Sequence, residues 1–279
     1  MAEELKTKNY TLGLLGGPRV RYSPSPAMHK AALAENGLVG DYLAVQVSPE
    51  SLADTVKALW ELGYWGFNVT NPHKVTIMES LCGVSEEAKA IGSVNTLVRT
   101  QEGYFGENTD APGFQSAYLE DIENPAALKP LVLGAGGSAR AIVTALKNSG
   151  FEVFLSSRDF SKARALAGEF GLTALDWVTL GEFGPFDLLV NATPSSSVRD
   201  FSPKPPAVRL NAGARVIDIN YGRDNNHFES ISLRAGGIFQ DGLGMLAHQA
   251  RLSFILWTGI DPGLAPLLRA VNNLLDKSE

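Results

Sequence analysis

Residues 131–139 read Leu-Val-Leu-Gly-Ala-Gly-Gly-Ser-Ala and join an apolar strand to a helix through glycines. The spacing of Gly134, Gly136 and Ala139 is G-x-G-x-x-A, which is typical of turns that hold a dinucleotide diphosphate. The first glycine permits the tight turn, the second leaves room for phosphate, and the alanine lets the helix pack closely. The alternative is a glycine-rich turn without a ligand. We expect the turn to bind through Gly134, Ala135, Gly136, Gly137, Ser138 and Ala139.

The end of the next strand indicates which dinucleotide is bound. An NAD site usually has Asp or Glu here, on the ribose 2′-hydroxyl. This chain has neutral Ser157 followed by Arg158, and a guanidinium suits a 2′-phosphate. Lys162, one helical turn later, adds a second positive charge. Asp159 would repel a phosphate unless it caps the helix that starts there. The pattern favours NADP, the alternative being that Arg158 is a solvated surface residue.

Strands alternate with helices on both sides of this turn, which predicts an α/β protein with mostly parallel sheets. The N-terminal half has expected strands at 10–16, 41–47 and 66–69, then a hairpin at 93–105 that makes the sheet edge mixed. Expected helices are 26–36, 51–62 and one beginning at Pro72. A second unit starts near Leu131, and the last stretch is two helices without a new strand. We place the domains at residues 1–112 with C-terminal helices within 245–279, and at 113–244.

Composition excludes several classes of protein. The 279 residues are 44% hydrophobic and 19% charged, a globular balance, and no stretch approaches the roughly 20 apolar residues of a membrane helix. A single cysteine, Cys82, excludes an intramolecular disulfide, and the four histidines lack metal-ligand spacing, so we expect no metal. A net charge of −6 disfavours nucleic acid. The polar N-terminus lacks a secretory pattern, so we expect a cytoplasmic protein.

Three polar positions in the N-terminal half are candidates for chemistry. Lys74 follows a buried strand and falls in the first turn of the expected helix, where the dipole disfavours an ammonium and suits proton transfer. Asp110 enters another helix, either as its N-cap or, if it faces Lys74, as a charge partner. Ser23 and Ser25 precede a helix N-terminus and can bind a carboxylate or act as caps. The alternative for Lys74 is a surface lysine at the start of a helix. The spacing of Lys74 and Asp110 along the sequence does not show whether they are in contact.

Together these motifs resemble the shikimate dehydrogenase family over nearly the whole chain. The resemblance rests on seven stretches: S-P-S-P-A-M-H at 23–29, N-V-T-N-P-H-K at 68–74, S-V-N-T at 93–96, G-E-N-T-D at 106–110, G-A-G-G at 134–137, N-A-T-P at 191–194, and G-L-G-M-L at 242–246 with Gln249.

The resemblance implies NADPH-dependent, reversible reduction of 3-dehydroshikimate to shikimate, a step of chorismate and aromatic amino acid biosynthesis. It implies an α/β substrate domain, a Rossmann domain, and C-terminal helices that return to the substrate domain. The expected protein is a monomer or homodimer, and the partner that it binds is its small-molecule substrate. Lys74 and Asp110 match the catalytic pair. The substrate-binding set matches Ser23, Ser25, Asn68, Thr70, Asn95, Tyr221 and Gln249. The remaining cofactor positions match Ser157, Arg158, Lys162, Ala192, Thr193 and Gly242.

Two alternatives stay open at this point. One is a quinate or quinate/shikimate dehydrogenase, with either NADP or NAD as its cofactor. The other is a non-catalytic paralogue that kept the fold, against which the presence of Lys74 and Asp110 weighs. Whether Lys74 or a water delivers the proton is also open.

Overall fold

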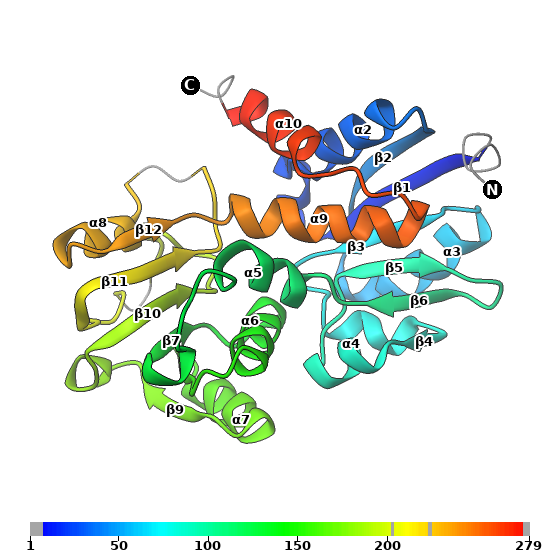
Figure 1. Ribbon diagram of the computed structural model, residues 1–279. Coiled ribbons are helices and arrows are strands. Elements are labelled where there is room, and N and C mark those ends of the chain that lie inside the picture. The colour runs from blue at the N-terminus through cyan, green and yellow to red at the C-terminus, as the bar shows by residue number, and fades with distance from the viewer. Residues whose placement is uncertain (1–7, 202–203, 223–224, 276–279) are drawn as a thin grey trace. The chain divides into compact units, whose positions relative to one another are not determined.

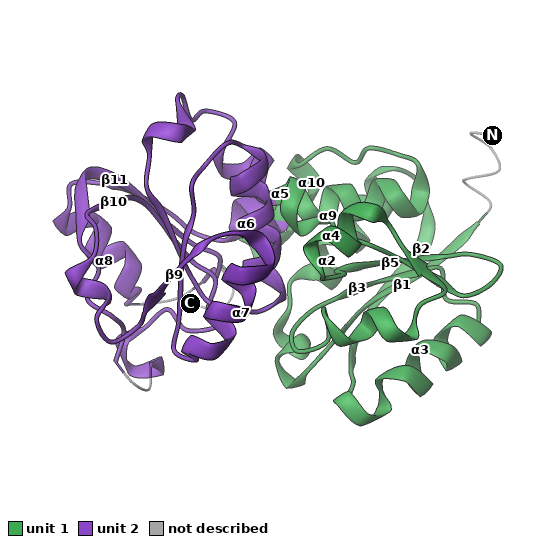
Figure 2. Cartoon of the chain, turned by 90° about the horizontal axis from the view of Figure 1, so that it is seen from below, with its two compact units in different colours: residues 1–113, 247–279 green, residues 114–246 purple. Residues whose placement is uncertain are grey.

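The computed structural model describes residues 8–201, 204–222 and 225–275. The chain forms two compact units, coloured separately in Figure 2. Unit 1 comprises residues 1–113 and 247–279, and unit 2 comprises residues 114–246. Among the described residues, no helix is both long and apolar enough to cross a membrane.

Unit 1 contains a mixed six-stranded sheet in the order β2-β1-β3-β5-β6-β4. Its strands are β1 (Asn9–Gly16), β2 (Val39–Gln46), β3 (Gly66–Val69), β4 (Gly83–Val84), β5 (Thr96–Arg99) and β6 (Tyr104–Glu107). β1 pairs in parallel with β2 and β3, whereas β5 is antiparallel to β3 and β6. The expected hairpin is therefore confirmed. Two-residue β4 lies outside it and was missed because the strand is too short to show a period.

The sheet of unit 1 buries an apolar core that includes Leu15, Phe67 and Leu97, and helices complete the unit. They are α2 (Ser25–Glu35), α3 (Leu52–Glu61), α4 (Glu86–Ile91) and α10 (Ala265–Leu275), with most of α9 (Leu243–Thr258) and 3-10 turns at η1 (Pro18–Tyr22), η2 (Pro49–Ser51) and η3 (Thr76–Ser80). The expected helix beginning at Pro72 is wrong. Residues 71–75 are successive turns that lead into η3, so Lys74 does not lie at a helix N-terminus.

The C-terminal helices return to the N-terminal part of the chain, as expected. α10 lies beside α2 (Figure 1), where Arg269 contacts the Glu35 carboxylate at 2.8 Å. On α9, the Trp257 indole donates to the Leu97 carbonyl of β5 at 2.9 Å. Gly66 makes room for this ring, because a Cβ there would come within 2.3 Å of the indole nitrogen.

Unit 2 is a parallel six-stranded sheet in the order β12-β11-β10-β7-β8-β9. Its strands are β7 (Pro130–Leu133), β8 (Phe154–Ser157), β9 (Thr173–Asp176), β10 (Phe186–Asn191), β11 (Leu210–Asp218) and β12 (Ile238–Gln240). Its helices are α6 (Gly137–Asn148), α7 (Phe160–Phe170), α8 (His227–Arg234) and most of α5 (Asp110–Tyr118), with 3-10 turns η4 (Pro125–Ala127), η5 (Leu180–Glu182) and η6 (Val198–Asp200).

The strand order of unit 2 is that of a dinucleotide-binding Rossmann sheet. The chain runs outward from β7 to β9 and then restarts on the other side at β10, so the order reverses between β7 and β10. Ligands of such sheets bind beyond the carboxyl ends of the strands at this switch point. The expected α/β class is confirmed, although the short strands β9 and β12 were not expected.

Candidate active site and dinucleotide site

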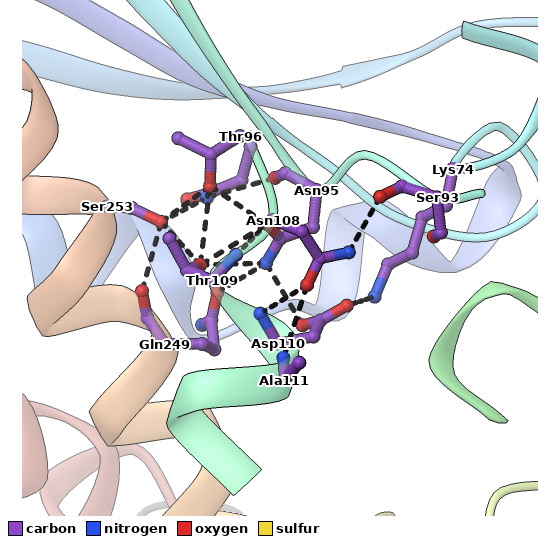
Figure 3. Close-up of polar contacts among 11 residues, drawn as sticks. Lys74, Ser93, Asn95, Thr96, Asn108, Thr109, Asp110, Ala111, Gln249 and Ser253 are labelled. Atoms are coloured by element: carbon purple, nitrogen blue, oxygen red, sulfur yellow. Dashed lines mark hydrogen bonds and ion pairs between the residues drawn. The ribbon is translucent and has the colours of Figure 1, made fainter. Parts of the chain in front are cut away.

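The Lys74 ammonium and the Asp110 carboxylate of unit 1 form an ion pair. Nζ lies 2.6 Å from Oδ2, and the two side chains are only 13% and 5% exposed (Figure 3). Lys74 is therefore not a solvated surface lysine. An ion pair this shielded from water is screened little and holds both groups in a defined orientation.

Asn108, not Asp110, caps helix α5. The Asn108 Oδ1 accepts hydrogen bonds from the backbone N–H groups of Asp110 (3.0 Å) and Ala111 (3.2 Å). Its Nδ2 donates to the Ser93 carbonyl at 2.7 Å. The prediction that Asp110 is the N-cap is thus wrong. Because Asn108 caps the helix, the Asp110 carboxylate is available to pair with Lys74. Sequence reasoning missed Asn108, although asparagine is a strong N-cap residue.

Asn95 holds the other oxygen of the same carboxylate. Its Nδ2 donates to Asp110 Oδ1 at 3.0 Å, while its own Oδ1 accepts the Thr109 backbone N–H at 2.7 Å. The backbone bond fixes which end of the Asn95 amide faces Asp110. Each oxygen of Asp110 therefore has its own donor, and the structure brings together Lys74, Asn95 and Asp110.

Ser23 and Ser25 cluster at the N-terminus of α2. The two hydroxyl oxygens lie 3.0 Å apart, and the Ser25 backbone N–H donates to Ser23 Oγ at 3.2 Å. Ser25 is buried and is the first residue of the helix, whereas Ser23 is half-buried. Two hydroxyls at the positive end of an 11-residue helix form a suitable site for a carboxylate.

Three further substrate candidates lie in unit 1 at different depths. Thr70 follows β3, is half-buried, and packs so closely on Gly16 that a Cβ there would come within 2.4 Å of its methyl group. Gln249 is buried on α9, and its Oε1 accepts from Asn95 Nδ2 at 3.4 Å. Asn68 is also buried, with its Oδ1 accepting from the Tyr42 hydroxyl and its Nδ2 donating to Ser253 Oγ at 2.9 Å. The Asn68 amide is thus engaged by the protein itself.

His29 lies fully buried under this site and stacks on Tyr42, with ring centroids 4.5 Å apart. Within the described ranges, neither of its ring nitrogens has a hydrogen-bond partner. Burial lowers the pKa of His29 to about 3, so the ring is neutral. This histidine is a packing residue of the core.

The glycine turn of unit 2 has the geometry needed for a diphosphate. Gly134 has a φ of +120°, and a Cβ there would press on the Ala192 carbonyl oxygen at 2.9 Å. Gly136 is the N-cap of α6, and a Cβ there would meet no protein atom within 4 Å. The open face of the turn therefore lies at the N-terminus of a 12-residue helix, beside the switch point. The residues present fit a dinucleotide.

Ser157, Arg158 and Lys162 follow β8 at the rim of the same sheet. Arg158 and Lys162 are exposed, and Ser157 is half-buried. Asp159 caps α7 by accepting the Lys162 backbone N–H at 3.2 Å, and it lies 3.5 Å from the Lys162 ammonium. The expected cap role of Asp159 is confirmed, and its negative charge is partly compensated.

The remaining candidates follow β10 and β11. Thr193 Oγ1 donates to Asn191 Oδ1 at 2.7 Å, next to Ala192. Tyr221 is half-buried after the end of β11. At Gly242 a Cβ would come within 2.0 Å of the Ile219 carbonyl oxygen, so the glycine permits a close chain approach.

A buried carboxylate that the sequence did not single out organises these loops. Asp218 ends β11 and accepts hydrogen bonds from the side-chain amides of Asn191 (2.8 Å), Asn220 (2.8 Å) and Asn226 (2.7 Å). Asn226 also caps α8. This network fixes the loop that carries Thr193. No group of three potential metal ligands occurs in the part of the chain that the structure describes.

A Rossmann sheet with a diphosphate turn, and a second α/β unit with a shielded lysine–carboxylate pair, define a nicotinamide-dinucleotide-dependent oxidoreductase. Comparison with known proteins narrows this class. Residues 15–97 match the shikimate dehydrogenase substrate binding domain, and residues 242–271 match the shikimate 5′-dehydrogenase C-terminal domain.

Individual relatives match over almost their whole length. The shikimate dehydrogenase (NADP(+)) of Thermus thermophilus is 40% identical over 94% of this chain and 97% of its own, and that of Shouchella clausii is 35% identical over 93% and 96%. A crystal structure of shikimate 5-dehydrogenase from Thermus thermophilus in complex with NADP(H) and shikimate superposes with a TM-score of 0.82 at 37% identity, covering 95% of this chain and 99% of that one. The chain belongs to the shikimate dehydrogenase family.

Proposed function

We propose that this protein reduces 3-dehydroshikimate to shikimate with NADPH, reversibly, as a step of chorismate and aromatic amino acid biosynthesis. The observation that carries the proposal is the 2.6 Å pair of Lys74 and Asp110, with both carboxylate oxygens held by separate donors. The pair survives intact in a chain that is 40% identical to a shikimate dehydrogenase (NADP(+)). A paralogue that had lost catalysis would have no need to keep this arrangement.

Lys74 acts at the substrate's carbonyl oxygen, which becomes a hydroxyl oxygen in the reaction. Reduction adds a hydride to the C3 carbonyl carbon and a proton to its oxygen, which becomes a hydroxyl. The dinucleotide, when bound, supplies the hydride. Lys74 stabilises the developing negative charge on that oxygen and donates the proton, directly or through a water. Asp110 orients the ammonium and balances its charge.

The other candidates of unit 1 bind the substrate. The hydroxyls of Ser23 and Ser25 at the start of α2 receive the carboxylate, because that helix end carries partial positive charge. Thr70, Asn95 and Gln249 supply polar groups for the ring hydroxyls. The Asn68 amide is occupied by Tyr42 and Ser253, so we assign it to holding this set in place.

Unit 2 binds NADP. The turn of residues 134–139 holds the diphosphate at the start of α6, and Arg158 with Lys162 receives the 2′-phosphate. Ser157 leaves this position without the carboxylate that an NAD site uses. Ala192, Thr193 and Gly242 complete the cofactor set.

A two-by-two oxidation assay tests the function. Shikimate or quinate is combined with NADP⁺ or NAD⁺, and reduced nicotinamide is followed by absorbance. Turnover with shikimate and NADP⁺ in clear preference to the other pairs is the expected result. Preferred turnover of quinate, or with NAD⁺, would establish the rival specificity. Absence of turnover in protein that binds NADPH would establish the non-catalytic reading.

A further inference from the structure

Ser253 on α9 is a buried hydroxyl that connects four segments of unit 1. Its Oγ lies 2.8 Å from Thr96 Oγ1, 3.1 Å from Thr109 Oγ1 and 3.0 Å from the Gln249 carbonyl (Figure 3). It also lies 2.9 Å from Asn68 Nδ2. We propose that Ser253 is a positioning residue that sets the orientation of Asp110, and through it of Lys74. The inference rests on the proposed dehydrogenase function of that pair.

The hydrogen-bonding capacity of one hydroxyl explains why this position is sensitive. A serine hydroxyl has one proton to donate and two lone pairs. Its proton goes to the Gln249 carbonyl one helical turn earlier, because that oxygen can only accept. Its lone pairs then accept hydrogen bonds from Asn68 Nδ2 and from the hydroxyl of either Thr96 or Thr109. The other threonine hydroxyl is directed at Asn95 Oδ1, which lies 3.1 Å from Thr96 Oγ1 and 3.3 Å from Thr109 Oγ1.

Short contacts lead from Ser253 to the catalytic carboxylate. Thr109 directly precedes Asp110, and its backbone N–H donates to Asn95 Oδ1 at 2.7 Å. The Thr109 hydroxyl oxygen lies 2.9 Å from Asn95 Nδ2 and 3.3 Å from Asn95 Oδ1. Asn95 Nδ2 then donates to Asp110 Oδ1 at 3.0 Å. Loss of the Ser253 hydroxyl removes a buried acceptor from the threonine pair. The Asn95 amide and the first residues of α5 can then adopt more than one arrangement, so the Asp110 carboxylate is no longer held in a single orientation.

The Asn68 amide is less affected by the same loss. Its two amide hydrogens have three oxygens within reach, since the Asn95 carbonyl and Thr96 Oγ1 each lie at 3.2 Å in addition to Ser253. Removing one acceptor leaves two. Removing the Ser253 hydroxyl is therefore expected to disturb Thr109 and the Asp110 side chain more than Asn68.

Thr258, on the same helix, provides a matched control. It is buried and donates to the Phe254 carbonyl one turn earlier at 2.8 Å, as Ser253 does to Gln249. Its hydroxyl also accepts from the backbone N–H of Ile260, two residues beyond the helix, at 3.1 Å. Thr258→Val removes a buried helical hydroxyl with nearly unchanged volume and leaves the Asn95–Asp110 contacts intact. Ser253→Ala removes the hydroxyl that has the additional partners.

The test combines kinetics with amide hydrogen exchange on the ligand-free protein. Ser253→Ala is expected to lower kcat for shikimate oxidation about tenfold to 100-fold, as a small misplacement of a catalytic group does, with little change in KM. The pH profile of kcat is expected to shift. The Thr109 amide is expected to exchange at least about tenfold faster, because its acceptor, Asn95 Oδ1, is less well held. Thr258→Val is expected to leave kcat and this amide as in the wild type.

Exchange at the Thr109 amide decides the inference whichever reaction the protein catalyses. Unchanged exchange in Ser253→Ala, or equal changes in both variants, would overturn it. If Ser253→Ala does not fold, Ser253→Cys replaces it, since a thiol keeps the position filled but bonds weakly. Wild-type protein without shikimate turnover would refute the dehydrogenase function alone, because the exchange comparison needs no substrate.

Discussion

The Asp110 carboxylate of unit 1 is held by side chains from separate segments of the chain, whereas the diphosphate turn of unit 2 is formed by nine consecutive residues. This site brings Lys74 and Asn95 to the Asp110 carboxylate in a position shielded from water. Each of the two carboxylate oxygens has its own donor. The turn at Gly134–Gly136 instead presents an open face, and Arg158 beside it is exposed. In the proposed function the first site acts on a small polar molecule. The open face of the second site is where the proposed anionic cofactor enters and leaves.

This difference predicts that substitutions in unit 1 change turnover and those in unit 2 change cofactor affinity. The largest expected effect is that of Lys74→Ala, which removes the proposed proton donor. We expect kcat to fall at least about 100-fold with a modest change in KM for shikimate, the usual contribution of a positioned acid. Steady-state kinetics with saturating NADP⁺ measure it. Lys57→Ala, at a lysine whose side chain is 76% exposed, is the control, and a near-wild-type kcat in Lys74→Ala would refute the assigned role.

Gly136→Ala tests whether the open face of the turn is reserved for the diphosphate. A Cβ there meets no protein atom, so the fold should tolerate it, yet it should weaken NADPH binding about tenfold to 100-fold by overpacking against phosphate. Fluorescence titration gives Kd and thermal unfolding gives Tm. Gly168→Ala, on α7 and equally open, should leave Kd unchanged. Unaltered NADPH affinity in Gly136→Ala would place the diphosphate elsewhere.

His29 makes unit 1 sensitive to acid. Its pKa is about 3 in the folded protein and about 6.5 when solvated, so between these values the unfolded chain binds a proton that the folded chain does not. The free energy of unfolding should therefore fall as pH falls below 6.5 and be independent of this group above it. From pH 7 to pH 5 the loss is about 2 kcal/mol.

His29→Phe should remove that contribution while keeping a ring against Tyr42. Urea unfolding at pH 7 and pH 5 measures the difference. In unit 2, burial and then Arg234 lower the pKa of half-buried His227, so His227→Phe should change the pH dependence in the same direction by less. An identical pH dependence in wild type and His29→Phe would show that the buried ring does not resist protonation.

The smallest expected effects are those of substitutions at the two basic residues after β8, Arg158 and Lys162, because exposed charged groups compete with water. In Arg158→Ala, KM for NADP⁺ should rise about tenfold, with less than about twofold change for NAD⁺, since only NADP carries the 2′-phosphate. Lys162→Ala should act in the same direction but by a few-fold, because its side chain is 73% exposed and already lies near Asp159. Arg164→Ala, exposed on the same helix, is the control. Equal rises for both cofactors would mean that Arg158 does not contact the phosphate.

Much of the molecule could be read from local patterns. The turn at 131–139, the strand and helix alternation and the hairpin at 93–105 are encoded within short windows, where periodicity and glycine placement determine backbone geometry. The same is true of the cap at Asp159. Two-residue β4 and three-residue β12 were missed because so few residues carry no period. The helix expected after Pro72 is a run of turns, which the proline alone did not reveal.

The sequence by itself determined which residue types stand where: two glycines and an alanine in the turn after β7, an arginine after β8, and a lysine and an aspartate 36 residues apart. Only the tertiary structure decided that Asn108 takes the helix cap and leaves Asp110 for Lys74. It alone brought Asn95 and Ser253, 158 positions apart, into one network. The physical reason is that a turn is fixed by the conformations of adjacent residues. A shielded ion pair depends on packing between strands and helices that meet only when the chain has folded.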